Sequence, residues 1–161
     1  MRQRATPSEL RKLIGIGNYQ FGAHAGDALF NRNVRIAHSR KTGRIRHIYL
    51  RQRLIATLRP TDGLLALTVD GALMLLTKTK TLRNRVIVQS DVAEYIRRGG
   101  DIFAKHIVSA SNSLRPAEEV LATDEEGRLI GVGSALQSGN DMKHFKRGVA
   151  IRIRHGIDDR A

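Results

Sequence analysis

The first half of the chain alternates between apolar and polar positions in a way that predicts one helix followed by several strands. The helix is expected to begin after Thr6, because Thr6, Pro7 and Glu9 occupy the N-cap, first-turn and capping-box positions of a helix start. Its apolar face is expected to end at residues 15–17, where two glycines flank an isoleucine. Alternating apolar residues between turn residues then predict a small antiparallel sheet. Its strands are expected at 34–36, 45–50, 54–58 and 65–69, with a helical turn at 71–76.

The second half predicts a strand, a helix, three strands, a short helix and a last strand. The first strand is expected at 85–88, and Ser90 is expected to cap a helix with an apolar face of Val92, Tyr95 and Ile96. Further strands are predicted at 102–108, 120–123 and 129–136, and the short helix begins at 140 or 141. Threonine and lysine alternate over 77–81, which predicts a linker and two domains, 1–82 and 83–161. The fold class is therefore α+β, with a sheet-and-helix domain first.

The composition excludes several classes of protein. The chain has 161 residues and no cysteine, which rules out disulfide scaffolds, thiol nucleophiles and cysteine-ligated zinc. No apolar run reaches the ~20 residues needed to span a bilayer, so a cytoplasmic protein without a membrane partner is expected. The six histidines show no pair at a metal-ligand spacing, and the glycine pairs do not form a nucleotide-binding motif. Neither a metal nor another cofactor is expected.

The positive charge points to a polyanionic partner. The formal net charge is +13, and residues 1–82 hold 15 basic side chains against four acidic ones. Arginine accounts for 21 of the 28 basic residues, and its planar fork matches phosphate oxygens better than the point charge of lysine. Nucleic acid is the commonest such partner. The alternative is that the arginine content reflects a GC-rich genome or adaptation to heat.

Three basic segments are candidates for contact with a nucleic acid. A predicted hairpin holds Arg40, Lys41, Arg44 and Arg46, and its solvated surface is the alternative explanation. The second segment follows the helix of the second domain and contains Arg97, Arg98, Gly99, Gly100 and Lys105. Its glycines could let a phosphate or ribose approach the backbone, or could simply end the helix. The third is the last strand, where Arg152 and Arg154 alternate with isoleucines and are expected to face outward.

Residues 85–155 resemble a PUA domain, an RNA-binding module named after pseudouridine synthases and archaeosine transglycosylases. The matching segments are 99–105 (Gly-Gly-Asp-Ile-Phe-Ala-Lys), 115–116 with 119–121, 131–135 and 147–151. Upstream, 19–22, 27–30, 39–45 and 58–63 are similar to the C2-like domain before the PUA domain of archaeal tRNA-guanine transglycosylases. The resemblance implies a mixed β pseudo-barrel, with the last strand and the loop after its first helix beside an RNA acceptor stem.

The resemblance implies RNA binding and does not extend to catalysis. The catalytic barrel of the transglycosylases has no counterpart in the chain, and the cysteine motif of the archaeosine synthases is missing as well. No catalytic residue is therefore expected. The chain is predicted to bind structured RNA, and tRNA in particular, as an accessory module for a separately encoded tRNA-modification enzyme. The alternatives are a non-catalytic subunit of a split transglycosylase or archaeosine synthase and, more weakly, a ribosome-assembly or translation factor.

Overall fold

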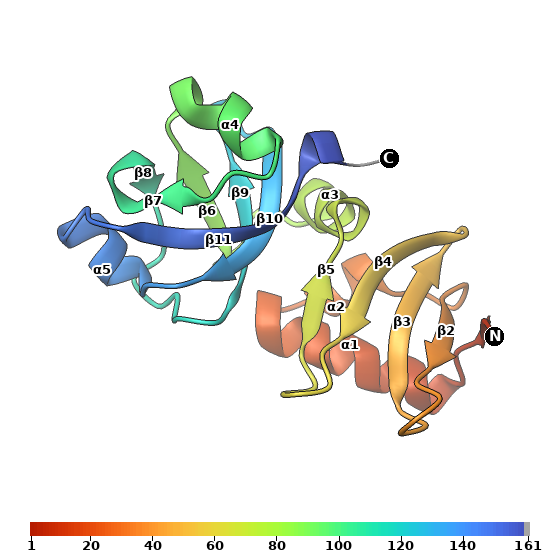
Figure 1. The fold of residues 1–161 in the computed structure, drawn as a ribbon. Coiled ribbons are helices and arrows are strands. Elements are labelled where there is room, and N and C mark those ends of the chain that lie inside the picture. Colours follow the sequence, from red (N-terminus) through yellow and green to blue (C-terminus); the bar gives the residue numbers. More distant parts are fainter. Residues whose placement is uncertain (160–161) are drawn as a thin grey trace. The chain divides into compact units, whose positions relative to one another are not determined.

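The computed structural model describes residues 1–159, which divide into two compact units, one of residues 1–81 and one that begins at Leu82 (Figure 1). The first unit is built on a five-stranded sheet in the order β1-β2-β3-β4-β5. Every neighbouring pair in this sheet is antiparallel. The strands are β1 (Gln3–Arg4), β2 (Arg35–His38), β3 (Ile45–Leu50), β4 (Arg53–Leu58) and β5 (Leu65–Leu67).

The two faces of this sheet differ in polarity, as the alternating sequence predicts. In one cross-strand row, Ile36, Ile48, Ala56 and Leu67 lie in register and are all buried. Successive side chains of a strand point to opposite faces, so this row marks the inner face. Three helices pack on the unit's apolar interior: α1 (Pro7–Phe21), α2 (Ala25–Leu29) and α3 (Val69–Lys78). Figure 1 shows α1 and α2 behind the sheet.

The prediction that the first helix ends at residues 15–17 is wrong, because α1 continues to Phe21. One of the two glycines, Gly17, allows a close helix crossing. A Cβ atom on Gly17 would lie 2.8 Å from the Cα of Gly26 in α2, a helix that the sequence pattern does not predict. Asn18 fixes the same crossing, since its Oδ1 accepts the backbone N–H of Gly26 over 2.7 Å. Helix α3 likewise begins earlier than expected, at Val69, and extends through the first two residues of the predicted linker.

The predicted start of α1 is confirmed as a complete capping box. The Thr6 hydroxyl accepts the backbone N–H of Glu9 over 3.1 Å, and Glu9 Oε1 accepts the backbone N–H of Thr6 over 2.9 Å. The other carboxylate oxygen of Glu9 lies 3.0 Å from Nε2 of His38 in β2. The Glu9 side chain therefore caps the start of α1 and links the helix to β2 of the sheet.

Replacing Glu9 with glutamine should make the first unit less sensitive to acid. The hydrogen bond from the Thr6 backbone lowers the pKa of Glu9 from its ordinary value of 4.5, although partial burial acts in the opposite direction. A depressed pKa means that the stabilisation is present above about pH 4.5 and is lost as the pH falls through the folded-state pKa. Urea unfolding at pH 7 and at pH 3 should therefore show a smaller difference for Glu9→Gln than for the wild type. An equal difference would contradict this role.

The second unit is built on a mixed six-stranded sheet in the order β7-β11-β10-β9-β6-β8. Strands β6 and β9 are parallel and the other neighbours are antiparallel. The strands are β6 (Arg85–Val88), β7 (Ile102–Phe103), β8 (Ile107–Ser109), β9 (Glu119–Thr123), β10 (Leu129–Ala135) and β11 (Val149–Gly156). The outermost strands, β7 and β8, are joined by a single turn, η2 (Ala104–His106). That short connection brings the two edges together, so the sheet curls into the predicted pseudo-barrel.

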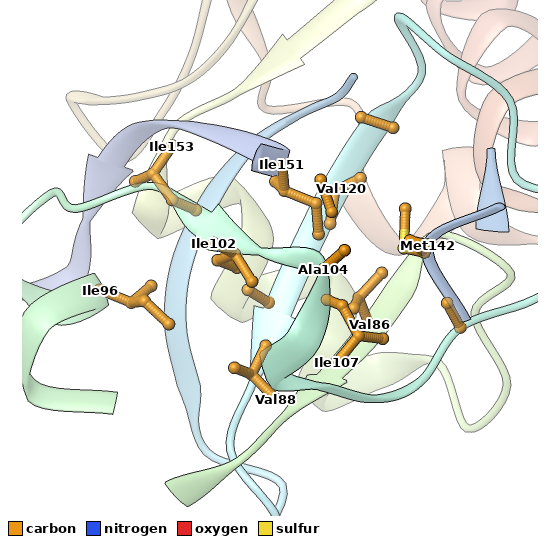
Figure 2. Packing of buried hydrophobic residues seen from close by; sticks show 14 of the residues in the cluster. Val86, Val88, Ile96, Ile102, Ala104, Ile107, Val120, Met142, Ile151 and Ile153 are labelled. Atoms are coloured by element: carbon orange, nitrogen blue, oxygen red, sulfur yellow. The ribbon is translucent and has the colours of Figure 1, made fainter. Parts of the chain in front are cut away.

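The interior of this pseudo-barrel is filled with aliphatic side chains from both the strands and the helices (Figure 2). Val86, Val120 and Ile151 come from three different strands, and each is fully buried. Ile96 of α4 (Ala93–Arg97) and Met142 of α5 (Gly139–His144) are buried in the same cluster. Burying each large aliphatic side chain contributes roughly 1.5–3 kcal/mol, so this cluster supplies most of the unit's stabilisation.

The structure corrects several details of the second half. The predicted strand at 102–108 is interrupted by η2, which divides it between the two edges of the barrel. The predicted helix begins with a 3₁₀ turn, η1 (Ser90–Val92), and Ser90 does not cap it with its side chain. Ser90 instead exchanges hydrogen bonds with Glu125, which follows the neighbouring parallel strand β9. Tyr95 is 58% exposed and so does not belong to the apolar face of α4.

Candidate nucleic-acid interface

Strand β11 carries the two arginines of the last predicted segment. Ile151 and Ile153 are buried, whereas Arg152 and Arg154 are exposed, so the predicted outward direction is confirmed. The sheet register shifts between Val132 and Gly133 of the neighbouring β10, opposite this part of β11. A bulge of this kind inserts one extra residue in one strand and changes the direction of its side chain. Arg152 and Arg154 consequently have different surroundings.

Arg154 forms a bidentate ion pair with a buried carboxylate. Its two terminal nitrogens lie 3.1 and 2.5 Å from the two carboxylate oxygens of Glu119 in β9. The Glu119 side chain has no exposed surface, and that of Arg154 is 32% exposed. A buried carboxylate needs a bound cation to offset its loss of hydration. The structure therefore shows Arg154 holding β11 against β9 across β10, a role that the sequence pattern does not predict.

Arg152 is placed differently, with its guanidinium in solvent. It lies in register with Ser134 of β10, and within residues 1–159 no carboxylate pairs with it. An exposed guanidinium with an uncompensated charge can donate two parallel hydrogen bonds to a phosphate. Of the two predicted arginines on β11, Arg152 is the one whose charge is available to a ligand.

The two arginines at the end of α4 are paired with nearby carboxylates. Nη2 of Arg97 lies 3.2 Å from Oδ1 of Asp158, and Nη2 of Arg98 lies 2.7 Å from Oε1 of Glu94, one turn earlier. All four side chains are substantially exposed. Exposed ion pairs are weak, typically about 0.2–1 kcal/mol, so a phosphate can compete for either guanidinium. Both arginines therefore remain candidates for RNA contact, because replacing either carboxylate partner with a phosphate costs little free energy.

Gly99 and Gly100, which follow these arginines, both have structural reasons to be glycine. Gly99 has a φ of +102°, a backbone angle that residues other than glycine rarely adopt. A Cβ atom on Gly100 would lie within 2.5 Å of the Tyr95 ring, which packs directly over this residue. The loop also lies against the end of β11, since a Cβ on Gly156 would lie 2.6 Å from the backbone nitrogen of Gly99. The fold thus brings the loop and the last strand together, as the resemblance implies.

Lys105 does not lie with this loop. It is exposed on η2, next to Ala104, whose N–H donates to the carbonyl of Gly148 just before β11 begins. The α4 loop, in contrast, contacts Gly156 at the other end of β11. At about 3.3 Å per strand residue, these two ends are roughly 20 Å apart. Lys105 and the α4 loop therefore lie at opposite ends of the strand that carries Arg152.

The basic hairpin of the first unit forms as predicted between β2 and β3. The turn is closed by hydrogen bonds from the Ser39 N–H to the Arg44 carbonyl and from the Gly43 N–H to the Ser39 carbonyl. Arg40, Lys41 and Arg44 are exposed on it. Arg46 is half-buried, and its Nη1 donates to the carbonyl of Leu58 over 3.3 Å. Among the described side chains, no carboxylate pairs with any of these four cations.

Two further basic residues lie beside the hairpin. Lys12 of α1 and Arg59 after β4 line the same pocket as Lys41, Arg44 and Arg46, whereas Arg40 is not part of its lining. Sequence reasoning missed both residues. Lys12 belongs to a helix more than 25 residues before the hairpin, and nothing in its spacing indicates the proximity. Arg59 could have been suspected, because it begins a second turn at the hairpin end of the same sheet.

Arg128, although exposed, is not available in the same way, because it belongs to an acidic turn between β9 and β10. Burial alone would raise the pKa of Asp124, but hydrogen bonds from the Arg128 backbone and guanidinium hold that pKa below its ordinary value. The hydrogen bond to Asp124 likewise raises the pKa of Arg128. With Glu125 and Glu126 exposed in the same turn, this end of the barrel disfavours a polyanion. This turn is therefore not part of the candidate interface.

Two kinds of feature are not found within residues 1–159. No group of three or more potential metal-ligating side chains gathers anywhere in this range. None of its helices combines the length and the apolar character that crossing a membrane requires.

Family comparisons identify both units. Residues 84–157 match the PUA domain, and residues 11–81 match the patch-forming domain C2 of tRNA-guanine transglycosylase. The second unit is thus a PUA domain, and it follows a unit that matches the transglycosylase C2 domain. More particularly, the chain is similar to the tRNA-guanine(15) transglycosylases of Methanobrevibacter smithii (40% identity over 154 residues) and Thermococcus kodakarensis (36% over 157). These matches cover 96% and 97% of the chain but only 23% and 27% of those enzymes. The chain thus spans about a quarter of the length of these curated relatives.

Solved structures share the fold along the whole chain. A hypothetical protein from Pyrococcus horikoshii superposes with a TM-score of 0.79 at 24% identity, and a conserved PUA domain protein from Thermoplasma acidophilum with 0.72 at 22%. Each match covers 99% of this chain and 96% of the other. At these identities the likeness concerns the fold alone.

Proposed function

We propose that this protein binds structured RNA, and tRNA in particular, through the sugar–phosphate backbone. The observation that carries the proposal is that most of the predicted contact cations have no carboxylate of residues 1–159 to neutralise them: Arg152 and Lys105 in the PUA domain, and Arg40, Lys41, Arg44 and Arg46 in the C2 domain. Each such cation that meets a phosphate releases condensed counterions from the RNA. Backbone contacts of this kind supply affinity and orientation without reading sequence.

The PUA domain is proposed to hold the RNA along β11. Arg152 supplies the primary phosphate contact, and Arg97 and Arg98 join it by exchanging their exposed carboxylate partners for phosphates. The contact of the α4 loop with Gly156 supports this arrangement, because it places the loop beside the end of the same strand. Gly99 and Gly100 leave the loop backbone without side chains, so a ribose or phosphate can approach it closely. Arg154 acts mainly by holding β11 in position.

The biological role that we propose is that of an accessory module for tRNA modification. The transglycosylase relatives support this role, because their matching portions are about a quarter of their length and correspond to the two domains seen here. The protein would bind tRNA and present it to a separately encoded enzyme. Catalysis is assigned to that partner, and no residue of this chain is proposed to act on the substrate.

A second candidate is a non-catalytic subunit of a split transglycosylase or archaeosine synthase. The extent of similarity to the transglycosylases favours it. The two roles differ in what they require of the partner: a subunit would form a stable complex with the catalytic chain and be needed for base exchange. Adding this protein to a purified catalytic chain and following guanine exchange into tRNA distinguishes them. A stable complex with dependent exchange favours the subunit, and exchange without a stable complex favours the accessory module.

Arg152→Ala should weaken tRNA binding and reduce its dependence on salt. Losing one phosphate contact is expected to reduce the slope of log K against log salt by about one unit. Fluorescence anisotropy with labelled tRNA across a salt series measures this slope. Lys143→Ala on α5 is the matched control, since it removes one positive charge of the same domain outside the proposed surface. The function proposed here fails if tRNA binds no better than a random duplex and Arg152→Ala behaves like the control.

A further inference from the structure

Three of the hairpin cations named above, Lys41, Arg44 and Arg46, also line a concave basic site in the C2 domain. A pocket of about 510 Å³ opens between α1, the β2–β3 hairpin and the turn after β4. The β2–β3 and β4–β5 turns lie at the same end of the antiparallel sheet, which is how they come to share a pocket (Figure 1). Its volume lies within the range of about 300–1,000 Å³ that is typical of small-molecule sites.

The charge inside this pocket is strongly positive. Five lining residues are basic: Lys12, Lys41, Arg44, Arg46 and Arg59. Arg59 is neutralised by Asp62, whose carboxylate lies 3.0 Å from its guanidinium. For the other four, no carboxylate partner exists in the part of the chain that the structure describes. Four like charges around one cavity repel each other, so an anion that enters it is bound favourably.

The remaining acidic side chains of this unit are engaged elsewhere or lie outside the pocket lining. Glu9 caps α1 and contacts His38, and Asp70 pairs with Arg53 over 3.0 Å. Asp27 belongs to the first turn of α2. The charge of the pocket is therefore left for a ligand to compensate.

The walls of the pocket combine these cations with apolar surface. Ile45, Leu58 and Pro60 line it beside the basic side chains. Arg46 is held in place by its hydrogen bond to the Leu58 carbonyl, so one guanidinium is fixed against the apolar wall. A bare inorganic anion would leave that wall unused. A ligand with a phosphate at one end and a flat, weakly polar group at the other would use both parts.

We propose that this pocket binds a single nucleotide unit, with its phosphate held by Lys12, Lys41, Arg44 and Arg46 and its sugar and base against Leu58 and Pro60. A free mononucleotide and an unstacked nucleotide of a bound RNA offer the same chemistry. The second source rests on the function proposed above; the first does not. A nucleotide that belongs to an RNA would have to leave the helical stack to enter the pocket.

Titration of the ¹⁵N-labelled full chain with guanosine 5′-monophosphate, guanosine and inorganic phosphate, followed by NMR, tests the site. The expected result is saturable shifts of amides of the hairpin and the β4–β5 turn with the monophosphate, and weaker binding of both guanosine and phosphate. Lys12→Ala and Arg44→Ala should each weaken binding of the monophosphate by about tenfold, because each removes one charge-assisted contact. Arg40→Ala is the matched control, because Arg40 lies on the same hairpin and outside the lining. Arg40→Ala should leave binding of the monophosphate unchanged.

Three results would overturn the site: no saturable shifts with the monophosphate, phosphate that binds as tightly as the monophosphate, or an equal loss in Arg40→Ala. Competition assigns the source of the nucleotide. If the monophosphate weakens tRNA binding in the wild type and not in Arg44→Ala, the pocket holds a nucleotide of the RNA. If it binds in the pocket without affecting tRNA, the ligand is a free nucleotide. The salt slope of Arg152→Ala is measured separately, so a failure of RNA binding and a failure of this pocket are distinguishable.

Discussion

Replacing Arg154 with alanine is expected to lower the free energy of unfolding of the PUA domain by about 3 kcal/mol. The substitution removes the bidentate partner of the buried Glu119 carboxylate, and breaking a buried ion pair by removing one partner typically costs 3–5 kcal/mol. The lower end applies because about a third of the Arg154 side chain is exposed. The melting temperature should fall by roughly 12–24 °C, which calorimetry or circular dichroism measures.

Two controls separate this effect from a general loss of charge. Arg152→Ala removes an arginine side chain two residues earlier in the same strand. No carboxylate of residues 1–159 pairs with Arg152, so this variant should change the free energy of unfolding by less than about 0.5 kcal/mol. Glu119→Gln in the Arg154→Ala background removes the buried negative charge and should recover part of the loss. If Arg154→Ala is no less stable than Arg152→Ala, the ion pair does not hold β11 in place.

The sequence predicted best those strands that are short runs of strand-forming residues followed by turn residues. Residues 45–50 and 85–88 were expected as strands, and the structure has strands with the same bounds at both places. Residues 86–88 are consecutive β-branched residues, and Ile45, Ile48, Tyr49 and Leu50 dominate the other segment. β-Branched and aromatic side chains are enriched in strands, so the local composition and the strand bounds have the same physical cause.

Elements that depend on distant contacts could not be predicted in this way. Strand β1 contains only Gln3 and Arg4, both exposed, and it exists because it pairs with β2 more than 30 residues later. Gly17 was interpreted as a helix end, although its actual role is a close contact with Gly26. A glycine in a helix therefore has two opposite explanations, and only the position of the neighbouring element decides between them.

In the candidate site, too, local sequence predicted the direction of the side chains but not their distant contacts. The outward direction of Arg152 and Arg154 followed from strand alternation, but the pairing of Arg154 with Glu119 joins residues 35 positions apart on different strands. The alternation rule treats the two arginines as equivalent. The structure distinguishes them by one buried carboxylate, which makes Arg154 important for stability and leaves the charge of Arg152 for a ligand.

Removing three charges from the hairpin is the substitution expected to affect RNA binding most. In the Arg40→Ala/Lys41→Ala/Arg44→Ala variant, three exposed cations that no carboxylate of residues 1–159 compensates are lost. Each phosphate contact contributes about 0.9 to the slope of log K against log salt, so the slope should fall by roughly 2.5–3 units. At about 0.1 M salt this corresponds to an affinity for tRNA that is lower by a few hundred-fold. Anisotropy titrations at several salt concentrations measure both quantities.

The result has a local explanation only if the position of the charges matters. A second variant, Arg32→Ala/Lys78→Ala/Lys80→Ala, removes the same number of positive charges from exposed sites of the same unit. If the protein attracts RNA only through its net charge, both variants should lose a similar amount of slope and affinity. If the hairpin touches phosphates, the control should keep most of the wild-type slope, because the field of a charge at ordinary salt is screened within about 8–10 Å. A control that matches the hairpin variant would therefore remove the hairpin from the RNA-binding surface, whereas a control close to wild type would locate the first unit's contact with RNA at this turn.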